Sequence, residues 1–452
     1  MSMKIKLPEK VNVIIETLLS HGYEAYAVGG CVRDSLLGRE ADDWDITTSA
    51  SPYEVKELFR RTVDTGIQHG TVTVMLDKEG FEVTTYRIDG EYEDGRHPKE
   101  VLFTKNLEED LKRRDFTINA MAYNEKSGLV DIFGGVKDLE SGIIRCVGVA
   151  KERFEEDALR ILRAYRFSAQ LGFEIEAETR KAATALSKNL RKISAERIRT
   201  ELTKLLLSGH PDRLVWAMAD GITPEFLPEW DRMWKTSQNN PNHIYNVGEH
   251  TLHVIMHAGE DNGRWTKKER TMLKYAALAH DIAKPDLKKL EETGEEHFPG
   301  HAKEGAAPAK QLMQRLKFDN ETTDMVVRLV AAHGEYEFEK TPSGMRKLMH
   351  RLGPDMMDLL WELQKADVLA QHPDGIREKL KALEISKALH GEVKQRGDCV
   401  SLKELAISGK DLILLGMEPG KEIGEKLTEL LERVLEQPEL NKREILLGLI
   451  RE

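Results

Sequence analysis

The stretch YAVGGCVRDSLLGREADDWDITT, residues 26–48, has the pattern of a strand, a glycine turn, a helix and a second strand. Its apolar start ends at Gly29-Gly30, and a helical segment containing Arg33 follows. Paired glycines at a helix start let backbone N–H groups approach a phosphate, and the positive end of the helix favours the anion. Arg33 adds a guanidinium that can bind a phosphate through two hydrogen bonds. We therefore predict a triphosphate-binding turn.

The end of this stretch carries two carboxylates, Asp43 and Asp45, just before the β-favouring Ile46-Thr47-Thr48. Alternate residues of a strand face the same way, so the two side chains are expected to project together. Close carboxylates repel unless a cation lies between them, and oxygen ligands suit Mg²⁺. Asp43 and Asp45 are therefore predicted to be catalytic metal ligands. Glu82 is a candidate third carboxylate, although an exposed strand residue explains it equally well.

Gly-Gly turns and Asp-x-Asp pairs are each common in surface loops, so the specific signal is their order and spacing. With Gly29-Gly30, Arg33-Asp34 and Asp43-x-Asp45 in this order, the chain resembles the nucleotidyltransferase superfamily typified by DNA polymerase β. Within that superfamily it is similar to the bacterial class II tRNA nucleotidyltransferases and poly(A) polymerases. The resemblance implies a polymerase-β-like head with a mixed sheet, Mg²⁺ at the Asp pair, and Gly29, Gly30 and Arg33 as nucleotide ligands.

Composition indicates a globular protein, and 452 residues allow two to four domains. We expect a cytoplasmic protein without a membrane partner, because no apolar run is long enough to span a membrane and the N-terminus lacks an apolar signal core. Three widely spaced cysteines predict neither disulfides nor a cysteine zinc site. The net charge is −11, yet residues 145–204 hold 14 Lys or Arg against 9 Asp or Glu. Such a basic segment can bind nucleic acid.

The segments that follow the first motif complete the predicted head. A helix is expected over residues 53–60, and strands are expected over 69–76 and 81–86 with a turn at 78–80. Residues 87–104 are polar and contain glycine, which favours a mobile surface loop. In class II tRNA nucleotidyltransferases a flexible loop at this position is needed for the switch to adding A, and enzymes that add only C lack it.

A basic pair follows in the string Arg113-Arg114-Asp115-Phe116-Thr117. Such a pair on a helix is most often a solvated face, but this string matches the family's Arg-Arg-Asp-Phe-Thr motif, which implies that Arg114 is a nucleotide ligand. A last strand is expected at 143–147, and the rest of the sequence is almost entirely helical. We assign residues 1–148 to the head and 149–235 to a helical neck that selects nucleotides and binds RNA.

A helix is predicted over residues 152–170, and four of its charged residues recur every three positions: Asp157, Arg160, Arg163 and Arg166. Arginines at this spacing often pair with acids of the same helix, such as Glu156. A carboxylate with a guanidinium also complements the amino donor and ring-nitrogen acceptor of cytosine and adenine, whereas uracil and guanine leave buried groups unpaired. The string matches the family's Glu-Asp-x-x-Arg motif, which implies that Asp157 and Arg160 read the base. Arg163 and Arg166 match further nucleotide-contacting positions.

Metal-ligand residues recur later in the order His250, His280-Asp281, His301, His333, Asp367. Imidazoles and carboxylates suit divalent transition metals, although a single histidine is more often a surface or packed residue. The ordered set resembles the HD phosphohydrolase superfamily, whose domain is appended to some tRNA nucleotidyltransferases. The resemblance implies a metal ion at His250, His280, Asp281 and Asp367, with His301 and His333 available for a second ion. Whether this domain hydrolyses a phosphate ester, only binds metal, or braces RNA is left open.

The sequence thus predicts an α+β protein: a head, an all-helical neck, an HD domain over residues 236–374, and a C-terminal helical tRNA-binding region over 375–452. The leading interpretation is template-independent addition of the 3′-terminal CCA to tRNA from CTP and ATP. An enzyme that adds only A and a poly(A) polymerase are alternatives of the same class. An HD phosphohydrolase with an inactive head is the alternative of another class, and the intact Asp-x-Asp argues against it.

Overall fold

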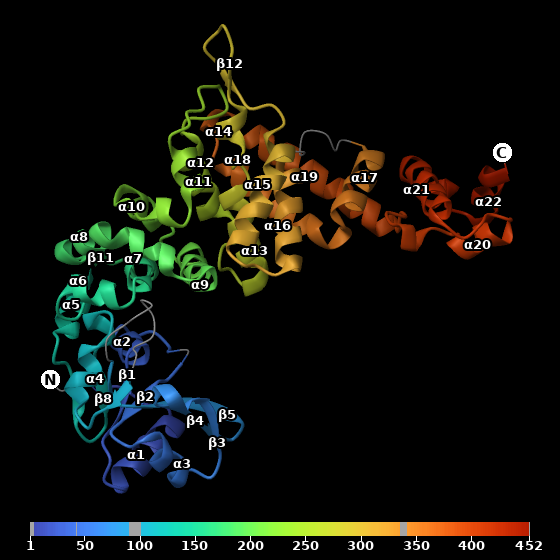
Figure 1. Ribbon diagram of the computed structural model, residues 1–452. Coiled ribbons are helices and arrows are strands. Elements are labelled where there is room, and N and C mark those ends of the chain that lie inside the picture. Colours follow the sequence, from blue (N-terminus) through green and yellow to red (C-terminus); the bar gives the residue numbers. More distant parts are fainter. Residues whose placement is uncertain (1–3, 42, 90–100, 335–340, 452) are drawn as a thin grey trace. The chain divides into compact units, whose positions relative to one another are not determined.

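The computed structural model describes residues 4–41, 43–89, 101–334 and 341–451. The chain forms two compact units, Met1–Pro228 and Glu229–Glu452. The predicted α+β class is confirmed, because the first unit holds a mixed sheet with helices and the second is helical apart from one short ribbon (Figure 1). The finer division into four domains stays a prediction. In the described ranges, no helix is long and apolar enough to cross a membrane.

The first unit is built on a seven-stranded sheet in which β2 and β5 run parallel and the other neighbouring strands run antiparallel. From edge to edge its strands are β3 (Thr62–Gly66), β4 (Thr71–Leu76), β5 (Glu79–Thr85), β2 (Ile46–Thr48), β1 (Ala25–Val28), β8 (Ala122–Asn124) and β9 (Gly128–Val130). Strand β1 is buried throughout, as the apolar run before Gly29 predicts. Helices α1 (Glu9–Ser20) and α3 (Pro52–Leu58) cover one face of the sheet (Figure 1).

Two local predictions for the strands of the first unit are wrong, and one strand was not predicted. The turn between β4 and β5 is Asp77-Lys78 rather than 78–80, and both residues have positive φ, as a two-residue hairpin turn requires. Strand β3 was not predicted, because TVDTG is an exposed edge strand without apolar alternation. The predicted strand at 143–147 shortens to β10 (Ile143–Ile144), which pairs with β11 (Glu174–Ile175) instead of joining the main sheet.

The predicted surface loop at 87–104 is partly strand. Its ends form an antiparallel ribbon of β6 (Arg87–Asp89) and β7 (Val101–Phe103). Residues 90–100 lie outside the described residues, so the expected mobility of this segment stays a prediction.

Helices complete the first unit: α2 (Gly30–Leu36), α4 (Leu107–Lys112), α5 (Gly135–Ser141), α6 (Ala150–Glu156), α7 (Leu159–Leu171), α8 (Ala177–Leu186), α9 (Ala195–Leu206) and α10 (Arg213–Ala219). Helix α7 is buried on almost every side and packs against α9 and α10. The predicted continuous helix over 152–170 is wrong, because the chain leaves helical geometry at Asp157, with φ −142° and ψ 101°. The Asp157 carboxylate accepts the Leu159 N–H at 3.1 Å, a local bond that competes with helix continuation.

The second unit consists of helices and a short hairpin: α11 (Pro228–Trp234), α12 (Val247–His257), α13 (Lys267–Ala279), α14 (Lys284–Leu287), β12 (Lys289–Leu290), β13 (Glu296–His297), α15 (His301–Arg315), α16 (Asn320–Ala332), α17 (Pro342–Leu352), α18 (Met357–Leu369), α19 (Pro373–Arg396), α20 (Gly409–Leu414), α21 (Lys421–Glu436) and α22 (Arg443–Arg451). Helix α18 is buried on most sides, and α12, α13, α16 and α19 pack around it. A separate apolar cluster joins α21 to α22 near the C-terminus.

Candidate active site and metal cluster

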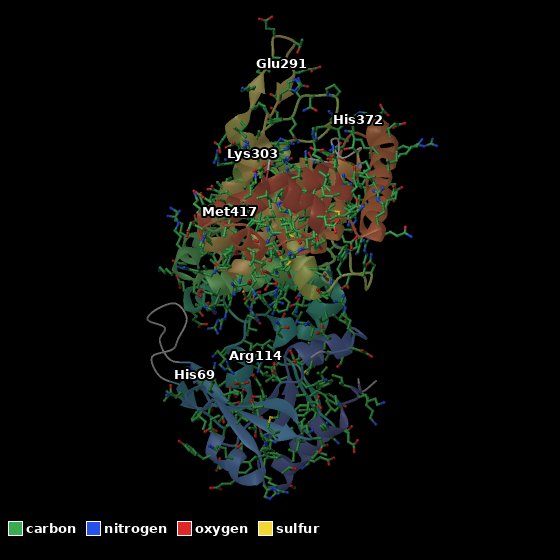
Figure 2. The ribbon with its side chains drawn as sticks, turned by 90° about the vertical axis from the view of Figure 1, so that its right-hand side faces the viewer. His69, Arg114, Glu291, Lys303, His372 and Met417 are labelled. Atoms are coloured by element: carbon green, nitrogen blue, oxygen red, sulfur yellow. The ribbon has the colours of Figure 1, made fainter. Side chains whose placement is uncertain are left out.

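The glycine turn of the first unit has the predicted backbone. Gly29 has φ +83° and directly precedes α2, a conformation that favours glycine. A side chain on Gly29 would lie 3.1 Å from Arg114 Nη1, so the turn and Arg114 are in close approach. Arg114, labelled in Figure 2, has a buried Nε without a hydrogen-bond partner in the described part of the chain. These features suit an anion between the turn and Arg114, and phosphate binding by them stays a prediction.

The paired carboxylates lie directly before β2 and not on it, because the strand begins at Ile46. The prediction that Asp43 and Asp45 alternate along a strand is therefore wrong, although their charges do act on each other. Loss of hydration raises the pKa of Asp45, the positive charge of Arg114 opposes that rise, and Asp43 adds to it. Loss of hydration and the charges of Asp45 and Asp43 likewise raise the pKa of Glu82 on β5. Glu82 thus lies within electrostatic range of Asp43 and Asp45, and binding of a divalent cation by these carboxylates stays a prediction.

Sequence reasoning missed Asp110, a fully buried carboxylate on α4. Its Oδ1 accepts hydrogen bonds from Arg113 at 2.7 and 3.0 Å, and its Oδ2 accepts from Arg114 at 3.3 Å and from the Thr47 hydroxyl at 3.1 Å. Burial opposes ionisation, but the two arginines outweigh it and hold the pKa of Asp110 below its usual value. Asp110 therefore ties Arg114 to the strand that follows Asp45. The spacing of an acid three and four positions before two arginines was the signal for it.

Arg33 is nearly buried and already has acidic and polar partners. Its Nε and Nη2 donate to the carboxylate of Asp34 at 2.9 and 2.8 Å, and its Nη1 donates to Asn119 Oδ1 at 2.7 Å. Asn119 in turn donates to Asp115 Oδ1 at 3.1 Å. Binding of a triphosphate by Arg33 would compete with these contacts, so its role as a phosphate ligand stays a prediction.

The predicted base-reading residues have partners that come from different elements. Asp157 Oδ2 accepts from Arg197 Nη2 at 2.7 Å, and Arg197 belongs to α9. Arg160 Nη1 donates to Glu156 Oε2 at 2.6 Å, which is the pairing with a nearby acid that its spacing also predicted. Its Nη2 donates to the Arg113 carbonyl at 2.9 Å. The Arg113 contact joins the base-reading segment to the Arg-Arg-Asp-Phe-Thr motif. No sequence signal pointed to Arg197.

The remaining arginines of α7 surround Phe167. Arg163 donates to Asp115 Oδ2 at 2.6 and 2.9 Å, and Arg166 Nε donates to Glu201 Oε2 at 2.8 Å. The guanidinium carbons of Arg163 and Arg166 lie 5.4 and 3.4 Å from the centroid of the Phe167 ring, within reach of cation–π attraction. Arg163 and Arg166 thus each have an acidic partner. Their contact with a nucleotide stays a prediction.

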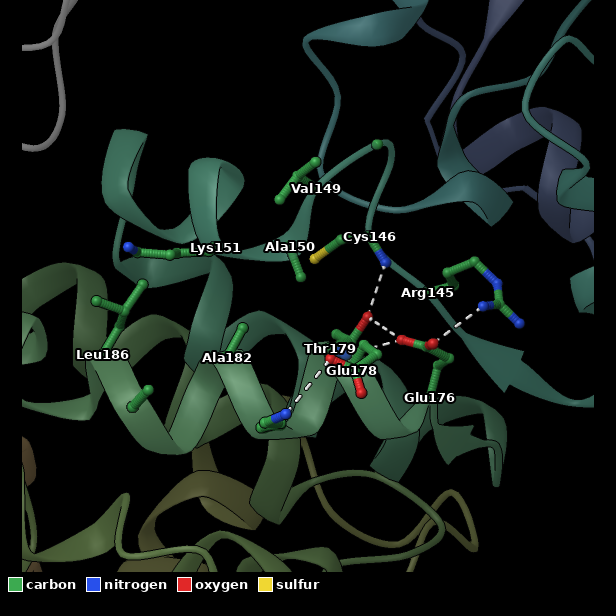
Figure 3. Close-up of a pocket in the computed structure, with 13 residues that line it drawn as sticks. Arg145, Cys146, Val149, Ala150, Lys151, Glu176, Glu178, Thr179, Ala182 and Leu186 are labelled. Atoms are coloured by element: carbon green, nitrogen blue, oxygen red, sulfur yellow. Dashed lines mark hydrogen bonds and ion pairs between the residues drawn. The ribbon is translucent and has the colours of Figure 1, made fainter.

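A pocket of about 400 Å³ lies beside α6 and α8 (Figure 3). Its lining includes Arg145, Lys151, Glu176 and the buried Cys146. Thr179 Oγ1 accepts the Cys146 N–H at 3.2 Å, and Glu176 lies 3.1 Å from Arg145, so these polar groups satisfy one another. None of the predicted site residues lines this pocket.

In the second unit the predicted metal ligands converge. Two groups of ligand atoms are each close enough to hold one ion, His250 with His280 and Asp281, and Asp281 with His301 and His333. Asp281 is shared, with Oδ2 3.1 Å from His280 Nε2 and Oδ1 3.4 Å from His301 Nε2. Asp367 lies beside the first group, where its Oδ1 is 2.9 Å from His250 Nε2. Helices α12, α15 and α18 and the ends of α13 and α16 supply these residues.

Backbone carbonyls orient all four histidines in the same way. Each Nδ1 contacts a carbonyl oxygen: His250 with Ala370 at 3.2 Å, His280 with Ala277 at 2.8 Å, His301 with Phe298 at 2.9 Å and His333 with Val330 at 2.7 Å. A carbonyl oxygen only accepts, so each Nδ1 donates a hydrogen bond to it, and Nε2 is the ring nitrogen that faces the cluster. This outer hydrogen bond is the arrangement that metal-bound histidines commonly have.

Positive neighbours keep the shared carboxylate of the cluster ionised. Burial opposes ionisation of Asp281, but His280 and Lys284 outweigh it and hold its pKa well below the usual value. Burial and the charges of His280 and His301 lower the pKa of His333 to about 3. His243 was not predicted as part of this site, yet its ring centroid lies 4.8 Å from that of His250. Its buried Nδ1 has no hydrogen-bond partner in the described ranges.

Three family models match parts of the chain. They are the poly A polymerase head domain over residues 25–145, the probable RNA and SrmB-binding site of polymerase A over 172–233, and a putative tRNA nucleotidyltransferase domain 2 over 301–450.

Relatives and solved structures extend this similarity to nearly the whole chain. A CCA-adding enzyme of Lactobacillus helveticus (strain DPC 4571) is 35% identical over 433 residues, which are 95% of this chain and 94% of that enzyme. The Lactiplantibacillus plantarum CCA-adding enzyme is 56% identical, but the alignment spans 44% of this chain and only 49% of that enzyme. The structure of the Bacillus stearothermophilus CCA-adding enzyme in complex with CTP matches with a TM-score of 0.71, 29% identity and coverage of 99% and 98% of the two chains.

Proposed function

Because the chain belongs to the family of CCA-adding enzymes, as its similarity over 94% of the Lactobacillus helveticus enzyme shows, we propose that it adds the 3′-terminal CCA to tRNA, using CTP and ATP without a nucleic-acid template. The observation that supports this proposal for the chain's own residues is the close approach of Arg114 to the Gly29 turn, together with the carboxylates of Asp43 and Asp45 directly before β2. A module that only binds RNA needs no such group of carboxylates. The buried, unpaired thiols of Cys31, Cys146 and Cys399 suit a reducing compartment, and we place the reaction in the cytoplasm.

In this proposal Asp43 and Asp45 hold Mg²⁺, and Glu82 adds negative charge beside them. The chemistry that such ions supply when bound is activation of a hydroxyl nucleophile and neutralisation of phosphate charge. Arg114, whose Nη1 lies next to the glycine turn and whose Nε has no hydrogen-bond partner among the described residues, binds the phosphates of the triphosphate. Asp110 keeps Arg114 in place through its buried ion pair. Gly29 and Gly30 bring the backbone close to the phosphates. Arg33 binds a phosphate by giving up one of its present hydrogen-bond partners, Asp34 or Asn119.

Base choice is assigned to Asp157 and Arg160. The carboxylate accepts the amino group of cytosine or adenine, and the guanidinium donates to the ring nitrogen beside it. Uracil and guanine place a carbonyl and an N–H in the reverse order, and each unmet buried group costs about 1–3 kcal/mol. Arg163 and Arg166 support this site from α7.

One experiment separates this function from its alternatives. Three tRNA transcripts ending before CCA, after C and after CC are incubated with CTP, ATP or both, and the products are resolved to single nucleotides. The proposal requires CTP to extend the first two transcripts and ATP to extend only the third. An enzyme that adds only A would extend only the transcript ending in CC, and a poly(A) polymerase would add A to all three.

A second activity is proposed for the histidine cluster, a metal-dependent phosphohydrolase of the HD type. The observation that favours it is the common orientation of His250, His280, His301 and His333, whose Nε2 atoms face a shared Asp281. Divalent transition metals bound to such ligands supply an activated water for phosphate-ester hydrolysis. Asp367 supports His250 from α18.

Metal analysis tests this second proposal independently of tRNA. The His280→Ala, Asp281→Ala double variant should lose the bound transition metal and the hydrolysis of bis(p-nitrophenyl) phosphate, while CCA addition continues. Unchanged metal content in the double variant would show that the ligands are misassigned. If the wild type binds metal but does not hydrolyse the ester, the cluster is a structural metal site and the proposed phosphohydrolase activity is wrong.

A further inference from the structure

Two anchors from different helices fix the Asp157 carboxylate. Its Oδ1 accepts the Leu159 N–H at 3.1 Å, at the start of α7. Its Oδ2 accepts from Arg197 Nη2 at 2.7 Å, from the first turn of α9. The side chains of Asp157 and Arg197 are 17% and 23% exposed, so this ion pair is shielded from water on most sides. The direction in which Asp157 presents its oxygens is therefore set by packing between α7 and α9.

The two anchors leave acceptor capacity on Asp157. An ionised carboxylate offers about four acceptor positions, and Leu159 and Arg197 use one on each oxygen. Asp157 can thus keep both anchors and still accept a hydrogen bond from an amino group. Arg160 is oriented separately, by Glu156 and the Arg113 carbonyl. The acidic half and the cationic half of the proposed base reader consequently depend on different residues.

We propose that Arg197 is a specificity-determining positioning residue, which holds the Asp157 carboxylate in the orientation that accepts the amino group of cytosine or adenine. This inference rests on the proposed role of Asp157 in base choice. Without Arg197 only the bond from the Leu159 N–H remains of the two anchors, and the carboxylate can turn about its side-chain torsions. Its acceptor oxygens would then be less often in place for an amino group. The kcat/KM for incorporation of CTP and ATP should therefore fall more than that for UTP and GTP.

Single-nucleotide incorporation with each of the four triphosphates tests the proposal. The proteins compared are wild type, Arg197→Leu, Arg197→Lys, Asp157→Ala and the Arg197→Leu, Asp157→Ala double variant, with Lys204→Leu as a control that removes a charge from the same helix. Arg197→Leu should lower the kcat/KM preference for CTP over UTP roughly tenfold, the size of one weakened buried hydrogen bond. Arg197→Lys should retain most of the preference, and Lys204→Leu should leave it unchanged.

The double variant decides whether Arg197 acts through Asp157. If it does, the preference of the double variant equals that of Asp157→Ala alone. An equal loss for all four nucleotides in Arg197→Leu, or a further loss of preference in the double variant, would overturn the proposal. A reduced preference in Asp157→Ala with none in Arg197→Leu refutes Arg197 alone, whereas an unchanged preference in Asp157→Ala refutes the base reader as well. If Arg197→Leu does not fold, Arg197→Gln gives the same readout.

Discussion

The candidate active site of the first unit and the histidine cluster of the second hold their charged groups in opposite ways. In the first unit the arginines that the motifs single out already bind acids: Asp34 for Arg33, Asp110 for Arg114, Glu156 for Arg160, Asp115 for Arg163 and Glu201 for Arg166. In the second unit the ligand atoms face one another, and the outer nitrogens of the histidines are fixed by backbone carbonyls.

We attribute this difference to the ligand proposed for each site, a nucleotide in the first unit and metal ions in the second. A metal site needs unprotonated donors that converge at one point, so the backbone can orient them before the ion arrives. A site for a nucleotide needs arginines that stay in place across several chemical steps, and an acid behind each guanidinium supplies that rigidity. Loss of one carboxylate should therefore have different effects on activity in the two cases: a large effect where the carboxylate contacts the ligand, and a smaller one where it only orients an arginine.

The largest effect is expected from a carboxylate that faces the ligand in the first unit. Asp45→Asn should lower nucleotide transfer on the order of a thousandfold, because a neutral amide binds Mg²⁺ poorly and the developing phosphate charge loses its counter-ion. Incorporation of CMP into a tRNA transcript measures it, and circular dichroism should show an unchanged fold. The exposed Glu40→Gln provides a matched control. Transfer within tenfold of wild type in Asp45→Asn would remove this carboxylate from the mechanism.

In the histidine cluster the shared ligand should matter more than an unshared one. Asp281→Asn removes a ligand from both groups, so metal analysis should find neither ion bound. His333→Gln removes a ligand from only the second group, and about half of the metal should remain. The exposed Asp286→Asn serves as the control on the following helix. Equal metal loss in Asp281→Asn and His333→Gln would show that the two groups bind as one site.

The same contrast explains how much could be predicted from the sequence. Metal-ligand types are few, and their order along the chain, through its resemblance to the HD superfamily, predicted His250, His280, Asp281, His301 and His333, which converge, and Asp367, which lies beside them. The partners of the arginines depend on tertiary packing. Arg197 lies forty positions after Asp157, and no periodicity relates the two. The break in the helix at Asp157 was also missed, because helical spacing alone does not reveal a side chain that bonds its own backbone.

Substitution of a carboxylate that only orients arginines should lower nucleotide transfer less than substitution of Asp45. Asp110→Asn keeps the shape of the side chain but removes the charge that holds Arg113 and Arg114. Transfer should fall roughly tenfold and stability by about 2 kcal/mol, the scale of a hydrogen bond to a charged group. Incorporation rates and chemical denaturation measure the two effects. The exposed Glu108→Gln on the same helix is the control, and equal losses in both variants would contradict a special role for Asp110.

The smallest expected effect is the pH dependence of that stability difference, and its sign follows from the pKa of Asp110. Burial raises this pKa, but Arg113 and Arg114 outweigh burial and hold it below the usual value of about 4. A carboxylate whose folded pKa is depressed stabilises the protein above its unfolded pKa and loses that contribution as the pH falls through the folded value. The gap in free energy of unfolding between wild type and Asp110→Asn should therefore be the same at about pH 7 and about pH 5.5, and smaller near pH 3.5. Denaturant titrations at the three pH values measure it, and a gap that widens with acid would mean that Asp110 is protonated in the folded protein and holds its arginines by other means.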